Sequence, residues 1–165
     1  MTPLVVLVGP PGAGKSTVGR LVADQRGVAF RDTDADVEAT SGETISEIFV
    51  DRGEDAFREL EREAVRIALT DHEGVLALGG GAVLDPQTRS SLRGHRVVFL
   101  DVGLADAAAR VGLNRDRPLL LGNPRAQLRT MLADRRPLYL EVASATVETD
   151  GREPEAVADA VLAAL

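Results

Sequence analysis

Short apolar runs alternate with longer segments of helical periodicity along this chain. The runs 4–8, 74–78 and 97–100 are almost entirely apolar and are bounded by glycine or polar residues. Runs of this kind are typical of strands buried on both faces of a sheet, and 28–30 and 146–149 are shorter candidates. Since strands and helices alternate throughout, the pattern predicts an α/β fold with a five-stranded parallel sheet flanked by helices.

The helical pattern is concentrated after the second strand. Helices are expected over 35–42, 44–52 and 54–70, with Gly42 and Gly53 between them. This is too long for one crossover helix and predicts a small helical insertion. The remaining helices are expected over 17–26, 85–92, 104–111, 125–134 and 154–164.

Composition narrows the possible functions. The 165 residues suit one domain, and the absence of cysteine excludes disulfides, thiolate metal sites and a cysteine nucleophile. The net charge of −7 argues against a nucleic-acid partner, which would require a basic face. No leader is expected before the first strand, and no apolar run approaches the roughly 20 residues that span a bilayer. The expected location is the cytoplasm.

The stretch 9–16 fits the pattern G-x-x-x-x-G-K-[ST], the P-loop. It lies between a predicted strand and a predicted helix, as the motif requires, so a chance glycine-rich turn is disfavoured. Its backbone amides can surround phosphate oxygens, Lys15 can reach the β and γ phosphates, and Ser16 can bind Mg²⁺. Lys15 is the chain's only lysine. The motif predicts a nucleoside triphosphate site.

Two aspartates follow the second strand. Because ligands bind at the carboxyl ends of parallel strands, Asp32 and Asp34 are expected in the site. Asp32 is placed to hold Mg²⁺ beside Ser16, and Asp34 could accept a proton from a substrate hydroxyl. The alternative is that one of them caps the following helix.

Two further segments suggest a binding site for the molecule that receives the phosphate, called the acceptor below. Phe57, Arg58 and Glu61 share one side of a helix, so Arg58 could bind a carboxylate while Glu61 orients it. From spacing alone a solvated, ion-paired face is the better explanation. Gly79, Gly80 and Gly81 follow the third strand and leave bare backbone that a ligand can approach.

Segment 112–124 is rich in Gly, Pro, Asn and Arg. It suits a lid that closes over phosphates, with Arg117 as a cationic finger on the transferred group. The alternative is an ordinary exposed loop. Neither His72 nor His95 lies near a motif, and both are expected at the surface.

Taken together, the motifs resemble those of the shikimate kinase family, small P-loop enzymes similar to nucleoside monophosphate kinases. The resemblance covers essentially the whole chain and rests on six pieces in order. They are GPPGAGKST at 9–17, Asp32-Thr33-Asp34, Phe57-Arg58-x-x-Glu61, Gly79-Gly80-Gly81, Arg117-Pro118-Leu119-Leu120 and Arg135-x-Pro137-Leu138-Tyr139.

The resemblance implies a single P-loop kinase domain over 1–165, with a substrate-binding insertion at 33–61 and a lid at 112–124. ATP would phosphorylate the 3-hydroxyl of shikimate, a step toward chorismate and the aromatic amino acids. The implied catalytic residues are Lys15, Asp34 and Arg117. The implied ATP contacts are Gly12, Ala13, Gly14, Lys15, Ser16, Thr17, Arg110, Arg117 and Arg152, with Pro154 near the adenine. The implied shikimate contacts are Asp34, Arg58, Glu61, Gly79, Gly80, Gly81 and Arg135, and Ser16 and Asp32 serve Mg²⁺.

Some alternatives stay open at this point. Arg136 adjoins Arg135, so the second carboxylate arginine is ambiguous, and Asp34 could orient the hydroxyl rather than take its proton. Gluconate or a nucleoside monophosphate could be the acceptor, and a nucleotide-dependent binding module is a different class. The expected partners are ATP and shikimate, without nucleic acid or membrane, and the expected state is a monomer.

Overall fold

A computed structural model describes residues 2–112 and 123–165. Over these residues the chain forms a five-stranded parallel sheet in the order β2-β3-β1-β4-β5. The central strand β1 pairs with both β3 and β4, so that Val6 lies beside Leu76 and Val97. The predicted α/β fold is confirmed. The strands are β1 Val5–Val8, β2 Phe30–Asp32, β3 Val75–Ala77, β4 Val97–Asp101 and β5 Ala145–Glu148.

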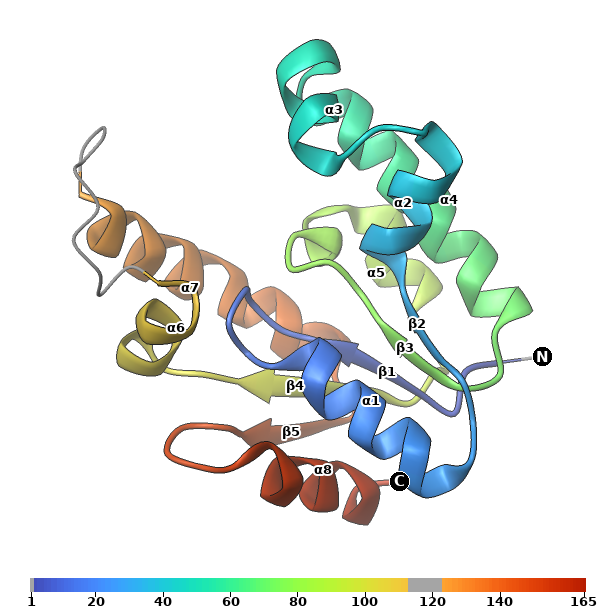
Figure 1. Cartoon of the computed structure of the whole chain (residues 1–165), viewed down its shortest axis with the longest axis vertical. Helices are drawn as coiled ribbons and strands as arrows, with labels where there is room; N and C mark the ends of the chain where they lie inside the picture. Colours follow the sequence, from blue (N-terminus) through green and yellow to red (C-terminus); the bar gives the residue numbers. More distant parts are fainter. Residues whose placement is uncertain (1, 113–122) are drawn as a thin grey trace.

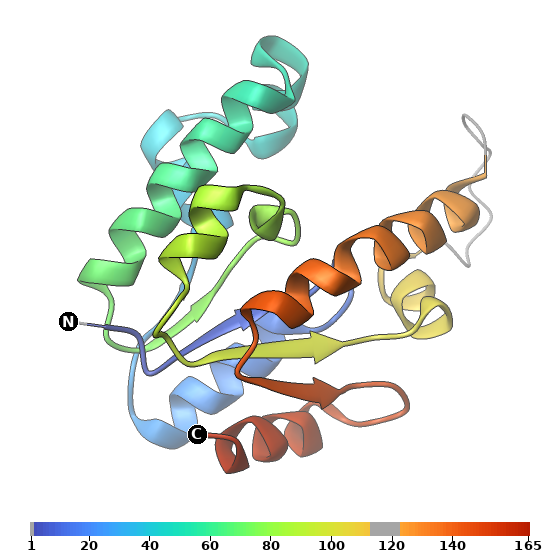
Figure 2. The same cartoon turned by 180° about the vertical axis from the view of Figure 1, so that it is seen from behind.

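Helices cover both faces of this sheet. α1 and α8 lie on one face, and α4, α5 and α7 lie on the other (Figures 1 and 2). The α-helices are α1 Lys15–Arg26, α2 Thr33–Ser41, α3 Ile45–Arg52, α4 Glu54–Asp71, α5 Pro86–Ser91, α6 Leu104–Arg110, α7 Pro124–Val142 and α8 Pro154–Ala163, and Ala82–Leu84 forms a 3₁₀ turn, η1.

The alternation of side chains along β1 divides the core into two apolar layers. Val5 and Leu7 pack with residues of α1 and α8, whereas Val6 and Val8 pack with residues of α4 and α7. All four side chains are almost fully buried, and each such burial stabilises the fold by about 1.5–3 kcal/mol. A strand with two buried faces explains why the run 4–8 is continuously apolar.

Helices α2, α3 and the first half of α4 project from the sheet (Figure 1). They share a small apolar cluster formed by Val37, Ile48 and Phe57. The cluster gives the helical insertion predicted after the second strand its own packing. No helix within 2–112 or 123–165 is long and apolar enough to cross a membrane.

Three local predictions were wrong. β2 begins at Phe30 rather than Val28, because this edge strand is only half-buried and its apolar residues do not mark its bounds. α7 continues through Pro137 instead of ending at 134. A proline inside a helix costs about 3 kcal/mol, but Tyr139, two residues further on, is buried in the core and holds the helix there. His72 is buried, with Nε2 3.0 Å from the Val75 carbonyl oxygen.

Candidate active site

The carboxyl ends of β1, β2 and β3 meet at one edge of the sheet. The P-loop follows β1, Asp32 ends β2, and Gly79–Gly81 follow β3. An open cavity of about 440 Å³ lies between them, lined by the P-loop, both aspartates, Gly80 and Arg110. The parallel topology therefore gathers the segments that the sequence marked as candidates.

The P-loop is shaped for an anion at the start of α1. Gly12 and Gly14 have φ angles of 84° and 92°, which side chains rarely tolerate, and Gly14 is the N-cap of the helix. The amides at this helix start carry partial positive charge. The loop thus presents donors for phosphate oxygens at the positive end of a helix dipole.

Lys15 folds back onto the loop. Its Nζ donates to the carbonyl oxygens of Gly9 at 2.6 Å and Pro10 at 3.1 Å. Burial lowers the pKa of Lys15 to about 8, although the charges of Asp34 and Asp32 partly offset this. The ammonium is therefore poorly solvated and gains from a nearby anion.

Asp32 performs two tasks with its two oxygens. Oδ1 accepts a hydrogen bond from the Asp34 amide at 2.9 Å and so caps α2. Oδ2 lies 3.3 Å from the Ser16 hydroxyl. The capping alternative is confirmed, and it leaves one carboxylate oxygen facing the P-loop.

Asp34 lies in the cavity between the P-loop and the turn after β3. Burial raises its pKa, as does the neighbouring charge of Asp32, while Lys15 acts in the opposite direction. Its carboxylate approaches the backbone closely, since a Cβ added at Gly79 would lie 2.5 Å from Oδ1. Asp34 is thus a partly desolvated carboxylate with raised proton affinity.

On α4 the partly buried Arg58 forms an ion pair with the buried Glu61. Nη1 of Arg58 donates to Oε1 of Glu61 at 2.8 Å, and the guanidinium lies 5.2 Å from the centre of the Phe57 ring. Glu61 is 2% exposed, and burial raises its pKa against the opposing effect of Arg58. The Nε of Arg58 is buried without a hydrogen-bond partner among the described residues. A solvated, ion-paired helix face is therefore the wrong explanation for this pair.

The turn after β3 leaves room for these side chains because it lacks Cβ atoms. A Cβ at Gly81 would lie 2.5 Å from both terminal nitrogens of Arg58. We expect Gly81→Ala to displace the guanidinium, because the end of a long side chain moves more easily than backbone. Acceptor KM should rise, with little change in Tm by thermal unfolding. A large drop in Tm would place the strain in the backbone instead.

The two adjacent arginines of α7 point to different places. Arg136 donates to Oδ2 of Asp101 at 2.9 Å, outside the cavity. Arg135 lies beside the Tyr139 hydroxyl, and its charge acts on Glu61 and Lys15. Of the two, Arg135 is the one near the candidate site.

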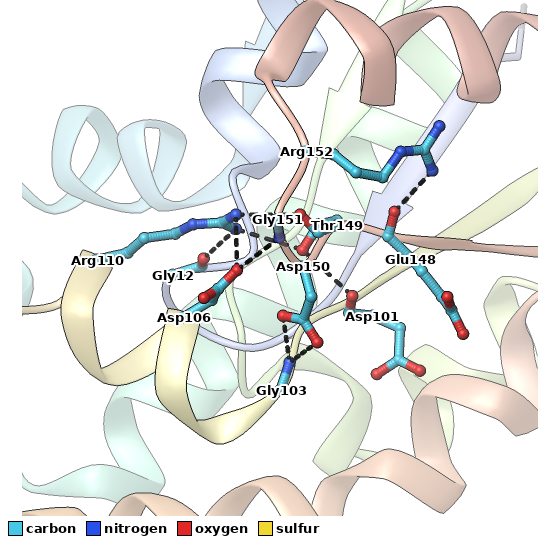
Figure 3. A network of polar contacts seen from close by, with 10 residues as sticks. All are labelled: Gly12, Asp101, Gly103, Asp106, Arg110, Glu148, Thr149, Asp150, Gly151 and Arg152. Carbon is cyan, nitrogen blue, oxygen red and sulfur yellow. Dashed lines mark hydrogen bonds and ion pairs between the residues drawn. The ribbon is translucent and has the colours of Figure 1, made fainter.

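A second polar network joins the P-loop to the segment after β5 (Figure 3). Arg110 donates from Nη1 to the Gly12 carbonyl at 2.9 Å and from Nη2 to the Thr149 carbonyl at 3.2 Å. The Gly151 amide donates to Oδ2 of Asp106 at 2.9 Å. These bonds tie α6, the P-loop and the β5–α8 loop together.

Arg152 is not brought to Arg110 in this arrangement. It donates to the Glu148 carbonyl at 2.9 Å and points away from Arg110 (Figure 3). Arg117 and most of the predicted lid at 112–124 lie outside the described residues.

The sequence reasoning assigned no role to two buried hydroxyls. Thr33 accepts a hydrogen bond from the Gly79 amide at 3.2 Å, and Tyr139 donates to the Gly80 carbonyl at 2.6 Å. Both lie inside recognised motifs, and Tyr139 is the chain's only tyrosine. Their place inside these motifs, and the fact that the chain has a single tyrosine, are the sequence features that mark these two hydroxyls.

A phosphate loop at a helix start, with two aspartates where β2 ends, is the arrangement of a P-loop kinase. Comparison with known proteins specifies the family. Residues 11–165 match the family model described as shikimate kinase. The chain belongs to the shikimate kinase family, and it is an ATP-dependent kinase.

Individual relatives agree with this assignment. A shikimate kinase from Salinispora arenicola is 62% identical over 165 residues, covering 100% of this chain and 99% of the relative. One from Frankia casuarinae is 60% identical over 162 residues, covering 98% and 72%. The structure of shikimate kinase from Acinetobacter baumannii in complex with shikimate superposes with a TM-score of 0.89 at 38% identity, covering 98% of this chain and 91% of that one.

Proposed function

We propose that this enzyme transfers the γ-phosphate of ATP to the 3-hydroxyl of shikimate, giving shikimate 3-phosphate and ADP. The observation that carries the proposal is the partly buried Arg58, which is oriented by Glu61 and whose buried Nε lacks a partner among the described residues. A buried, unsatisfied guanidinium nitrogen is costly unless a ligand completes its bonding. A carboxylate bound by Arg58 would do so, and shikimate is a carboxylate with three hydroxyls.

Binding of shikimate would use three segments. Arg58 and Arg135 would hold the carboxylate from α4 and α7, while Asp34 would select the hydroxyls. Backbone of the turn after β3 would contact the ring. Residues 33–61 would then form the acceptor-binding insertion of a single kinase domain.

Transfer itself requires positioning and charge stabilisation more than covalent chemistry. Lys15 would exchange its bonds to the Gly9 and Pro10 carbonyls for bonds to ATP phosphates. Asp34 would orient the 3-hydroxyl and accept its proton. We further propose that Arg117, in a lid over 112–124, stabilises the transferring group.

Ser16 and Asp32 would hold Mg²⁺. Both supply oxygen, which this ion prefers, and they are already adjacent, since the Ser16 hydroxyl donates to Oδ2 of Asp32 at 3.3 Å. Mg²⁺ in such sites is held mostly by phosphates and water, so two protein groups suffice. When bound, the ion would neutralise charge on the β and γ phosphates.

The adenine would lie near Arg110, with Arg152 and Pro154 on the other side of its site. Arg152 would have to leave the Glu148 carbonyl to reach it. We propose that the enzyme acts as a monomer without a nucleic-acid partner, in keeping with its net charge of −7.

The direct test is ADP release from the purified chain with MgATP, measured with shikimate, gluconate, AMP or no acceptor. Turnover that depends on shikimate supports the proposal. Turnover with gluconate or AMP instead would leave the P-loop assignment intact and overturn the acceptor site. ATP binding without turnover on any acceptor would favour a nucleotide-dependent binding module.

Arg58→Ala should raise KM for shikimate far more than KM for ATP, by about tenfold or more, because a charge-assisted bond of about 1.5–3 kcal/mol is lost. Initial rates with each substrate varied in turn provide the measurement. Arg66→Ala is a matched control, since Arg66 forms an exposed i, i+3 pair with Glu63 on the same helix. If KM for ATP rose instead, Arg58 would lie outside the acceptor site.

A further inference from the structure

The turn Gly79–Gly81 is held from opposite sides by two buried hydroxyl groups. Thr33, at the start of α2, accepts from the Gly79 amide at 3.2 Å. Tyr139, near the end of α7, donates to the Gly80 carbonyl at 2.6 Å. Their exposed fractions are 0% and 1%. Both bonds are thus shielded from water that could replace them.

The remaining backbone groups of the turn divide into paired and available ones. The carbonyls of Gly79 and Gly81 accept from the amides of Ala82 at 3.1 Å and Leu84 at 3.0 Å. All three carbonyls and the Gly79 amide are therefore engaged. No described residue accepts a hydrogen bond from the amides of Gly80 and Gly81. Gly80 lines the cavity and Gly81 adjoins the guanidinium of Arg58, so both available donors belong to residues beside the candidate acceptor site.

A triglycine segment does not hold such an orientation by itself. Without Cβ atoms its peptide groups can rotate among many conformations at little cost. Fixing two amides therefore requires ties from outside the turn. The hydroxyls of Thr33 and Tyr139 supply such hydrogen bonds, one to Gly79 and the other to Gly80.

We infer that Thr33 and Tyr139 are positioning residues that fix the Gly80 and Gly81 amides for the acceptor. This inference rests on the proposed function. Neither side chain lines the cavity, so each would act through the turn. Their hydroxyls set how precisely the acceptor is bound beside Asp34.

Simple core packing would not require either hydroxyl. The Tyr139 ring stacks on Phe99 with centroids 5.0 Å apart, a contact that phenylalanine could make equally well. Burial raises the pKa of Tyr139 to about 12, so the hydroxyl keeps its proton throughout the neutral range. Thr33 has the shape of valine apart from its hydroxyl. Each tie can therefore be removed with almost no change in volume.

The test compares Thr33→Val and Tyr139→Phe with the wild-type enzyme. We expect KM for shikimate to rise about tenfold in each variant while KM for ATP stays at the wild-type value. Calorimetric titration with shikimate alone should show the same loss without turnover. Thr33→Ser keeps the hydroxyl and should restore wild-type binding.

Thr88→Val is the matched control. Thr88 is 2% exposed, and its hydroxyl has no partner among the described residues. Removing it should leave both KM values unchanged, which separates loss of a tie from loss of any buried hydroxyl. Circular dichroism establishes that each variant is folded.

Unchanged shikimate binding in both folded variants would overturn the inference while leaving the proposed function standing. A parallel rise in both KM values would also overturn it, because it would assign the hydroxyls to general packing. The proposed function fails separately, if the wild-type enzyme shows no shikimate-dependent ADP release. If one of the two variants does not fold, KM for shikimate in the other variant tests the inference. Thr33→Ser, compared with the wild-type enzyme, remains a further test of the Thr33 hydroxyl.

Discussion

Replacing Lys15 by alanine should lower kcat by about 10³-fold or more, because a cationic side chain that stabilises the transition state of phosphoryl transfer contributes about that much. The Lys15 ammonium lies within the P-loop, where it donates to the Gly9 and Pro10 carbonyls, and alanine supplies no charge for the β and γ phosphates. ADP release at saturating substrates measures the loss, and circular dichroism should show an intact fold. Near-wild-type turnover would remove Lys15 from the mechanism.

Lys15→Arg is the informative partner of this variant. It keeps the positive charge but replaces a compact ammonium by a planar guanidinium. We expect it to fall well short of wild-type activity, because Nζ fits within 2.6 Å of the Gly9 carbonyl inside the loop. Full activity would mean that charge alone suffices.

The same residue makes a prediction about stability. The pKa of Lys15 is about 8 in the folded chain and about 10.5 when unfolded. Below pH 8 both states hold the proton. Between these values the unfolded state holds more protons, so the free energy of unfolding rises with pH. Lys15→Met should remove this dependence and stabilise the ligand-free protein at pH 7, by at most about 3 kcal/mol.

Asp34→Asn should lower kcat by about 10²–10³-fold, a typical contribution of a general base. Asparagine keeps the size and can still donate to a hydroxyl, but it cannot accept a proton. Steady-state rates with shikimate measure the change. Asp36→Asn is a suitable control, because Asp36 pairs with Arg31 at 2.7 Å and does not line the cavity. Unaltered kcat in Asp34→Asn would exclude a role as base.

The pH dependence of the wild-type enzyme follows from the raised pKa of Asp34. Burial is the main cause of this rise, and the charge of Asp32 adds to it. In the wild-type enzyme kcat/KM for shikimate should fall on the acid side at a pH above the ordinary value of 3.8. Between pH 3.8 and the raised pKa of Asp34, the folded state holds more protons than the unfolded state. The free energy of unfolding therefore falls as pH rises through this range. Asp34→Asn should lose the acid limb and unfold at no lower Tm at pH 7.

The sequence predicted the layers of the fold well because β1 and β4 are buried on both faces and read as continuous apolar runs. β2 was misplaced because an edge strand has no such requirement. The end of α7 was misplaced because packing of Tyr139 outweighs the local cost of Pro137. Sequence patterns misplaced these two bounds because contacts with distant parts of the fold determine where β2 begins and where α7 ends.

For the site, motifs identified the segments but not their contacts. The spacing of Arg58 and Glu61 fits an exposed ion pair as well as a buried one, and only the turn after β3 distinguishes them. Likewise, α7 directs Arg136 to Asp101 and Arg135 to the neighbourhood of Tyr139 and Glu61, a difference that adjacent positions in sequence do not reveal. The roles proposed for these residues stay predictions until the variants are measured.

Helix α4 belongs to two apolar clusters along its length. Phe57 packs in the cluster of the insertion, with Ala64 against it, whereas Val65, Ala68 and Leu69 pack against the sheet. A chimera that takes its acceptor-binding part from a relative therefore has a natural junction between Ala64 and Val65. An exchange ending there would carry Arg58 and Glu61 with their own packing and leave the sheet's core sequence untouched.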